Sequence, residues 1–185
     1  CDYWVLKLYS TGNKQWQKST GGNYYDYGTS VFQATDGGYI VSGLSSSTNG
    51  DVTGNHGSYD YWAVKLNGSG NTIEWQKSYG GTASDQANSI IQTTDGGYMI
   101  AGHTKSLNGD VAFNHGDNDW WLLKTNSTGT IQWQQSFGGD SLDYLFSLIL
   151  SNDGYYLATG FSRSFNGDIT VNKGKVDMWV MKLLC

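Results

Sequence analysis

The chain of 185 residues contains no proline, only two cysteines and a single arginine. Proline interrupts the hydrogen bonding of a central strand, so its absence leaves every segment free to join a β-sheet. Two cysteines are too few for a disulfide-rich scaffold, and their places at positions 1 and 185 match no metal-binding spacing. No apolar run reaches the length of about 18 residues that a membrane-spanning helix needs.

Basic residues are scarce as well. Lys and Arg together number 11 against 16 Asp and Glu, and the formal net charge is −5. Nucleic acids and anionic membranes bind through dense clusters of Lys and Arg, so we expect no nucleic acid as partner and no insertion into a membrane. No signal peptide is recognisable. If the protein is exported, we expect this sequence to be that of a mature chain or of a fragment.

Glycine (26 residues) and aromatic residues (15%) are abundant instead, and the sequence repeats itself. The Asp-x-Trp triplets that begin at Asp2, Asp60, Asp119 and Asp177 are 58, 59 and 58 residues apart. A fixed period of this length indicates one supersecondary unit stacked on copies of itself. We divide the single repeat domain, residues 1–185, into repeats 2–59, 60–118 and 119–176, followed by a further copy of the first strand at 177–183.

Each repeat is predicted to contain four strands. In residues 60–118, Trp62, Val64 and Leu66 alternate with other residues as in a strand, and a glycine-rich turn leads to a second strand. Asp95-Gly96 is a favoured hairpin turn between the third and fourth strands. The pattern predicts an all-β fold, specifically a β-propeller-like array of about three four-stranded antiparallel blades plus one surplus strand.

Three motifs carry a resemblance to known repeats. They are Asp-Tyr-Trp-Val-x-Lys-Leu, Gly-Asn-x-x-x-Trp-Gln-Lys-x-x-Gly-Gly and Ser-Ile-x-Gln-Thr-x-Asp-Gly-Gly-Tyr. These motifs resemble the β-propeller-like repeats of secreted bacterial surface proteins of the Bacteroidetes type, and the resemblance covers essentially the whole chain. It implies a propeller-like fold and a secreted or cell-surface location. Proteins of that group usually carry more copies, which leaves open whether this chain is part of a longer array.

The predicted strands number thirteen, one more than three four-stranded blades require. Three arrangements accommodate the surplus strand: the chain is part of a longer ring, it closes on itself with an extra edge strand, or it donates the strand to a neighbour. Antiparallel pairing of strand 2–8 with strand 177–183 would bring Cys1 and Cys185 to the same end. We predict a disulfide between these two positions, within one chain or between two chains.

The long polar loop of each repeat offers candidate calcium ligands. Ca²⁺ takes about six to eight oxygen ligands from carboxylates, amides and carbonyls. Such oxygens recur in three sets: Asp51, Asn55 and Asp60; Asp110, Asn114 and Asp119; Asp168, Asn172 and Asp177. The alternative is that these side chains bond their own backbone and stiffen the loops. We expect no required cofactor, with Ca²⁺ as the one candidate.

No catalytic constellation stands out from the repeat pattern. Asp26, Asp85 and Asp143 each precede a serine by four residues, but no histidine accompanies each pair, so we expect a turn-stabilising hydrogen bond. Glu74 is the only glutamate, and no carboxylate breaks the repeat as the unequal pair of a glycoside hydrolase would. The sequence therefore predicts no enzymatic activity.

Aromatic residues have two predicted roles. The tryptophans of the Asp-x-Trp strands, at positions 4, 62, 121 and 179, are expected in the core. A second set follows the Gly-Gly pairs and is a candidate for stacking on sugars: Tyr24, Tyr25, Tyr27, Tyr144 and Phe146. Repeated shallow sugar sites would bind with avidity.

Together these observations predict a non-enzymatic extracellular scaffold with a structural or adhesive role. We expect it to associate with itself, through the surplus strand or a terminal disulfide, or with other surface proteins. The alternative is a carbohydrate-binding, lectin-like module of a secreted protein, with glycans as partners.

Overall fold

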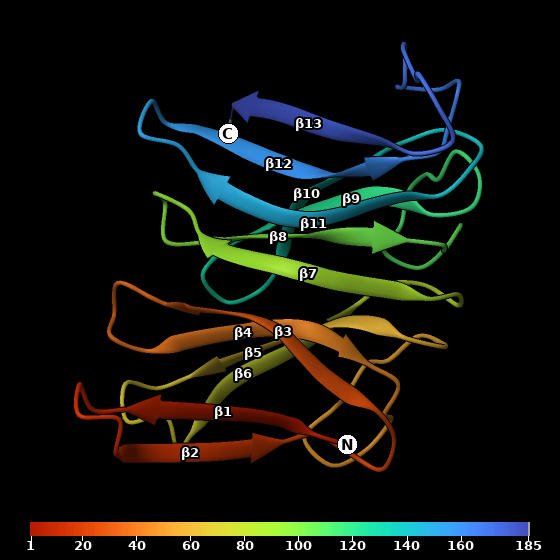
Figure 1. Cartoon of the computed structure of the whole chain (residues 1–185). Coiled ribbons are helices and arrows are strands. Elements are labelled where there is room, and N and C mark those ends of the chain that lie inside the picture. The colour runs from red at the N-terminus through yellow and green to blue at the C-terminus, as the bar shows by residue number, and fades with distance from the viewer. Residues whose placement is uncertain (185) are drawn as a thin grey trace.

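The computed structural model describes residues 1–184, and these form thirteen β-strands and no helix, so none of them forms a helix that could cross a membrane. Four antiparallel sheets contain two, four, four and three strands. They stack from the first sheet at the bottom to the fourth at the top (Figure 1). The strands are β1 (Tyr3–Leu8) and β2 (Lys14–Thr20); β3 (Asp26–Gln33), β4 (Tyr39–Ser45), β5 (Asp60–Leu66) and β6 (Ile73–Tyr79); β7 (Asp85–Gln92), β8 (Tyr98–Thr104), β9 (Asp119–Thr125) and β10 (Ile131–Phe137); β11 (Asp143–Leu150), β12 (Tyr155–Ser162) and β13 (Asp177–Leu184).

The all-β prediction is confirmed, but each complete sheet is built across a repeat boundary. The second sheet takes β3 and β4 from repeat 2–59, and β5 and β6 from repeat 60–118. The long loop after β4 returns the chain so that the Asp-x-Trp strand pairs antiparallel with β4, with Gly43 opposite Trp62. Two complete four-stranded sheets are thus flanked by sheets of two and three strands, and the propeller-like arrangement of the sheets stays a prediction.

Consecutive sheets pack face to face through three hydrophobic cores. We call the face of each sheet that carries Tyr3, Tyr61, Trp120 or Met178 its upper face, and the opposite face its lower face. The upper face of each sheet packs on the lower face of the next, and three aromatic contacts mark these junctions. The ring centroids lie 4.5 Å apart for Tyr3 and Trp62, 4.7 Å for Tyr61 and Trp121, and 4.5 Å for Trp120 and Trp179.

The core prediction holds for Trp62 and Trp121, and in part for Trp179, which is half-buried against the third sheet. Trp62 and Trp121 are fully buried, whereas Trp4, on the lower face of the first sheet, is 65% exposed. The sequence motif is the same in each case, so burial depends on the neighbouring sheet. The prediction that Trp4 belongs to the core is therefore wrong.

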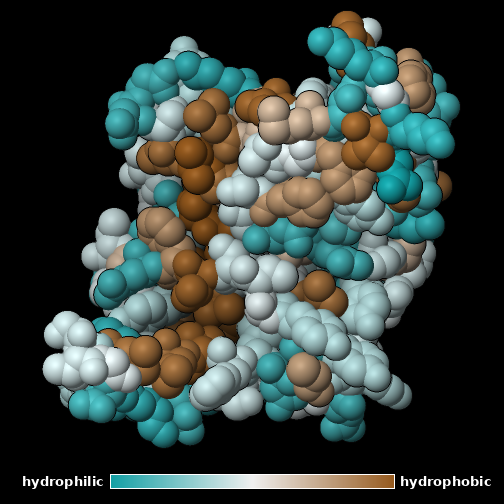
Figure 2. Space-filling view, in the orientation of Figure 1, coloured by the Kyte–Doolittle hydropathy of each residue, from teal (hydrophilic) through white to brown (hydrophobic). Residues whose placement is uncertain are grey.

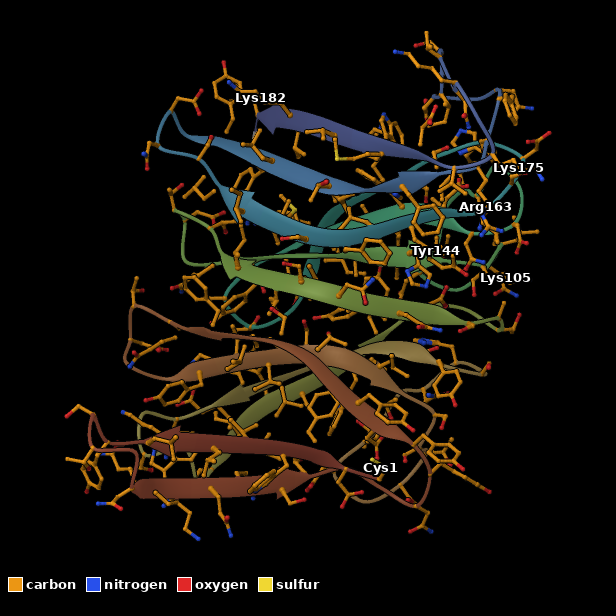
Figure 3. The ribbon with its side chains drawn as sticks, viewed as in Figure 1. Cys1, Lys105, Tyr144, Arg163, Lys175 and Lys182 are labelled. Carbon is orange, nitrogen blue, oxygen red and sulfur yellow. The ribbon has the colours of Figure 1, made fainter. Side chains whose placement is uncertain are left out.

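The pairing of strand 2–8 with strand 177–183, which would bring the two cysteines to the same end, does not form. β1 pairs with β2 and β13 pairs with β12, at opposite ends of the stack. Figure 3 shows Cys1 at the first sheet and Lys182 at the fourth. Cys1 is an exposed free thiol, and Cys185 lies outside the described residues, so the predicted disulfide stays a prediction.

Candidate functional site

The first aspartate of each long loop fastens the loop to a Gly-Gly pair. Asp51 Oδ2 accepts hydrogen bonds from Thr20 Oγ1 at 2.8 Å and from Gly21 N at 3.2 Å. The amide of Asp51 donates in turn to Gly21 O at 2.9 Å. The carboxylate thus caps an amide of the Gly-Gly pair and ties the long loop to it. The reciprocal bonds recur between Asp110 and Gly80 and between Asp168 and Gly138.

The other calcium candidates are engaged in the same way. Asn55 Oδ1 accepts from Gly57 N at 3.0 Å, and Asn55 Nδ2 donates to Ser45 O at 2.8 Å. Asp60 Oδ2 accepts from His56 N at 2.8 Å and lies 2.7 Å from His56 Nδ1. Equivalent bonds are made by Asn114, Asp119 and His115 and, with a lysine amide as donor, by Asn172, Asp177 and Lys173.

Burial makes the carboxyl of Asp60 a weaker acid than usual. Asp60 is fully buried, and desolvation raises its pKa to about 6, although the bonds from His56 lower it in part. Asp85 is also buried and has a raised pKa for the same reason. A Cβ added to Gly80 would lie 2.5 Å from Asp85 Oδ2 and 2.8 Å from Asp60 Oδ1, so glycine is required between the two carboxyls.

Calcium binding stays a prediction. Within residues 1–184 no group of three or more His, Cys, Asp or Glu side chains is arranged to hold a metal ion. Each candidate side chain accepts a backbone N–H bond with one oxygen, which replaces part of the coordination that a cation would supply, whereas Oδ1 of Asp60 and of Asp119 is buried without a partner among the described residues. We expect millimolar Ca²⁺ to leave the melting temperature unchanged in calorimetry. A calcium-dependent rise that Asp51→Asn removes would instead establish the site.

The aspartates at 26, 85 and 143 find different partners from those predicted. Their partners are not the serines four residues on but a Ser/Thr-x-Ser motif after the fourth strand of the repeat. Asp85 accepts from Thr104 Oγ1 at 2.5 Å, and from Ser106 Oγ and Gly81 N at 2.8 Å. The motif recurs at the repeat spacing as Ser45-x-Ser47, Thr104-x-Ser106 and Ser162-x-Ser164, so the sequence contained a signal that could have found it.

A second repeated ion pair joins the Asp-x-Trp strand to the hairpin turn beside it. Lys65 Nζ lies 2.8 Å from Asp36 Oδ2, although the lysine side chain is only 3% exposed. This bond lowers the pKa of Asp36. The same pair forms between Lys124 and Asp95 at 2.8 Å and between Lys182 and Asp153 at 2.6 Å. In β1 the equivalent Lys7 has no carboxylate partner in the described part of the chain and lies over the Tyr39 ring.

The sugar-stacking candidates form two groups on different sheets. Tyr24, Tyr25 and Tyr27 precede or begin β3 and are 60%, 54% and 44% exposed, with parallel rings for Tyr25 and Tyr27 at 6.1 Å. Tyr144 and Phe146 belong to β11 in the fourth sheet, where both pack on Phe161. Tyr144 lies on the same side of the molecule as Lys105 and Arg163 (Figure 3). The structure therefore does not bring the five residues together into one site.

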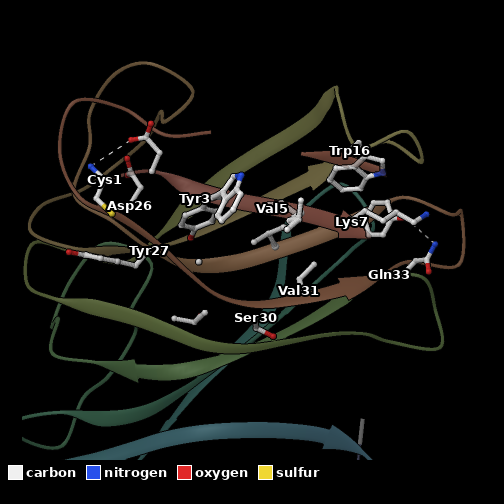
Figure 4. A pocket seen from close by; sticks show the side chains of 17 residues that line it. Cys1, Tyr3, Val5, Lys7, Trp16, Asp26, Tyr27, Ser30, Val31 and Gln33 are labelled. Atoms are coloured by element: carbon white, nitrogen blue, oxygen red, sulfur yellow. Dashed lines mark hydrogen bonds and ion pairs between the residues drawn. The ribbon is translucent and has the colours of Figure 1, made fainter. Parts of the chain in front are cut away.

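A groove at the lower end of the stack is the largest hollow that we describe. It lies between β1 and β3 and has a volume of about 680 Å³. Tyr3 and Val5 of β1 line it together with Val31 of β3 (Figure 4). Figure 2 shows apolar side chains in a column that runs from the top sheet to the bottom one. Sequence reasoning missed this groove, because it exists only where a sheet of two strands lies under a sheet of four.

No protein-family model matches the chain, and no curated protein is similar to it in sequence. Three structural features therefore bear on function: the repeated loop network, the two aromatic groups and the end groove.

Proposed function

We propose that the chain is a non-enzymatic structural or adhesive scaffold of a secreted or cell-surface protein. The observation that carries this proposal is the repeated use of the polar side chains. Asp26, Asp85 and Asp143 occupy equivalent buried places, and each accepts hydrogen bonds from a Gly-Gly amide and from a serine hydroxyl just after the next strand. A catalytic site needs unlike groups that converge on a substrate. A network that is the same in every repeat stabilises the repeat instead.

The architecture that fits this role is a propeller-like or solenoid-like array. Stacked units in which each contacts only its neighbours form long, stiff binding or spacer elements. The resemblance of the repeats to those of bacterial surface proteins supports the same role and a location outside the cell. The composition agrees, because the low charge of 15% and the repeated Asp-Gly turns suit exposed, turn-rich β proteins.

A carbohydrate-binding function is the second candidate, and one observation favours it. Tyr24, Tyr25 and Tyr27 form an exposed group that no other described aromatic side chain covers. Aromatic rings present an apolar face with a polar tip, which suits the face of a sugar ring. A single group of this kind would bind a glycan weakly.

The two functions are separated by display of the chain on a non-adherent bacterium, combined with a glycan array. A scaffold is expected to make cells clump or hold to a surface without binding any glycan selectively. Selective glycan binding that Tyr25→Ala removes and that Tyr9→Ala leaves intact would overturn the scaffold proposal in favour of the lectin. Tyr9 is a matched control because it is 55% exposed and lies outside the group.

A further inference from the structure

We propose that copies of this chain join head to tail by strand exchange. In the separate chain, β13 occupies the position beside β12 that β1 of a second copy takes when the copies join. In the joined form, the β11–β12 hairpin of one copy pairs with β1 of the next, and β13 is released. This inference rests on the proposed scaffold function and names its partner, a second copy of the same chain.

The strands β1 and β13 are equivalent in sequence and in their pairing edge. Both are copies of the Asp-x-Trp strand. Gly160 of β12 lies opposite Trp179 of β13, just as Gly43 lies opposite Trp62 inside the second sheet. Within residues 1–184, the edge of β1 that faces away from β2 pairs with no strand. That open edge is the one through which β5, β9 and β13 each pair with the strand before them.

The lower face of β1 is apolar, and no sheet of the described residues covers it. Trp4, Leu6 and Leu8 are 65%, 40% and 49% exposed. Their counterparts Trp62, Val64 and Leu66 in β5 are fully buried. In the joined sheet, β1 would take the place of β13 above the third sheet of the other copy. Its tryptophan would then lie on Trp120, where Trp179 lies in the separate chain.

The groove between β1 and β3 lies beside the open edge of the first sheet, which has two strands fewer than a complete sheet. Val31 of β3 is 58% exposed there, whereas the equivalent Ile90 and Leu148 are only 2% exposed because a complete sheet lies beneath them. At both complete junctions a serine of the lower sheet accepts a backbone bond from the sheet above. Ser30 Oγ accepts from Ile90 N at 3.2 Å, and Ser89 Oγ accepts from Leu148 N at 3.2 Å.

The same junction can be continued into a second copy. Ser147 on β11 is the repeat equivalent of Ser30 and Ser89. If the β11–β12 hairpin enters the groove of the next copy, Ser147 Oγ lies where it can accept from Val31 N. Figure 4 shows Val31 and Ser30 on β3 beside this groove.

Lys7 of β1 and the turn between β11 and β12 carry opposite charges. Lys7 of β1 is the equivalent of Lys65, Lys124 and Lys182, which pair with the aspartate of the hairpin turn beside them. In the joined sheet, Asp153 of the turn between β11 and β12 would leave Lys182 of its own chain and meet Lys7 of the next. Every copy would then have the ion pair that the complete sheets already contain.

Exchange of equivalent elements is a low-cost route to association, because the released strand is replaced by one that makes the same bonds. Burial of the lower face of β1 replaces that of Trp179, Met181 and Leu183 on the released β13, so the net gain is the filling of the groove. The contact is heterologous, with different surfaces on the two partners, so the product is a ring or an open filament. A strand that pairs with an exposed sheet edge is a well-established mode of protein recognition.

The first experiment measures mass by light scattering on the full chain from about 1 µM to about 1 mM with reductant, after incubation in mild denaturant to let β13 open. We expect mass to rise with concentration. Trp4→Lys should weaken assembly by roughly 100-fold, because it places a charge where Trp62 is fully buried. Phe113→Lys is the matched control: Phe113 is 60% exposed on a long loop, and assembly should be unchanged.

A disulfide lock tests the exchange itself. Thr159 and Val180 lie opposite each other on β12 and β13. The substitutions Thr159→Cys and Val180→Cys, in a chain with Cys1→Ser and Cys185→Ser, can therefore form a disulfide that holds β13 in place. We expect the oxidised chain to remain monomeric and the reduced chain to assemble. Assembly of the locked chain would overturn strand exchange, and so would a wild-type chain that stays monomeric throughout.

Failure of strand exchange and failure of the scaffold function give different results. A monomeric chain that still makes cells clump would remove strand exchange and leave the scaffold role in place. A chain that assembles but also binds a glycan through Tyr25 would remove the scaffold role and leave strand exchange in place.

Discussion

At the scale of single residues, the repeat is held together by carboxylates that are buried with their donors. Asp85 accepts hydrogen bonds from two hydroxyls and from Gly81 N, and these bonds connect the beginning of β7 with the end of β8. The bonds partly offset the rise in pKa that burial causes. Burying a carboxylate in this position has a large desolvation cost, and removing it destabilises the fold because its buried donors lose their acceptor.

We expect Asp85→Ala to lower the free energy of unfolding by about 3 kcal/mol, because it leaves three buried donors without an acceptor. Urea denaturation followed by tryptophan fluorescence measures the change. Asp140→Ala is the control: Asp140 is exposed and uses only its amide to bond Asn166, so the expected change is below about 0.5 kcal/mol. Equal effects of the two substitutions would contradict the structural role given to Asp85.

The pH dependence of stability follows from Asp60. Its folded pKa of about 6 lies above the ordinary value of 3.8, so between these values the folded chain keeps a proton that the unfolded chain has lost. Asp60 therefore contributes stability at low pH that disappears as the pH rises through about 6. His103 acts in the opposite direction, because burial lowers its pKa to about 4.

Comparison with Asp60→Asn isolates this contribution, since His103 is present in both chains. On going from pH 7 to about pH 4.5, the wild type should gain about 2 kcal/mol of stability relative to the variant. Urea denaturation of both proteins at several pH values measures the difference. A difference that does not change with pH would show that Asp60 titrates normally.

At the scale of elements, the Asp-Gly turns fix the hairpins that become the first two strands of the second, third and fourth sheets. Gly96 lies between β7 and β8 with φ +82°, a conformation that side chains rarely adopt, and the site of its missing Cβ is open space. Any cost of substitution there comes from the backbone alone. Gly68 lies in another turn without a positive φ, and an added Cβ would meet its nearest neighbour at 3.4 Å.

Gly96→Ala should accordingly lower the free energy of unfolding by about 1 kcal/mol, whereas Gly68→Ala should be close to neutral. Thermal and urea denaturation of the two variants, side by side with the wild type, provide the measurement. If Gly68→Ala proved the more damaging of the two, the hairpin turn would not have the conformation described here.

At the scale of the whole molecule, we expect the middle sheets to be the most stable against local unfolding and the first sheet the least stable. The second and third sheets have neighbours on both faces, and their Asp-x-Trp strands are fully buried. The first sheet has two strands, one face exposed, and a groove beside it. Arrays in which units contact only their neighbours open most easily at such ends.

We expect backbone amides of β1 and β2 to exchange with solvent at least about 100-fold faster than those of β5 and β9. Hydrogen–deuterium exchange with mass spectrometry measures this in dilute protein. If copies join through β1, the same amides of the wild type should become protected at high concentration. In the Trp4→Lys variant, these amides should remain unprotected at the same concentration. Uniform protection along the dilute chain would contradict the order of stability proposed for the four sheets.

The candidate sites could be predicted only in part. The loop aspartates and asparagines were identified from their recurrence, and the turn role weighed for them agrees with the bonds of Asp51 and Asn55. The partners of Asp26, Asp85 and Asp143 were predicted wrongly, because hydroxyls that are distant in sequence meet these carboxyls only after β4, β8 and β12 have paired. The end groove had no sequence pattern of its own.

The sequence by itself determined the all-β class, the number of strands and their turns, because alternation and Asp-Gly pairs are local properties that need no partner. The tertiary structure alone decided which strands share a sheet, since that depends on where the long loop returns the chain. It also decided that Trp62 is buried and Trp4 exposed. The two tryptophans have the same sequence motif but differ in burial, because burial depends on whether a neighbouring sheet covers the side chain.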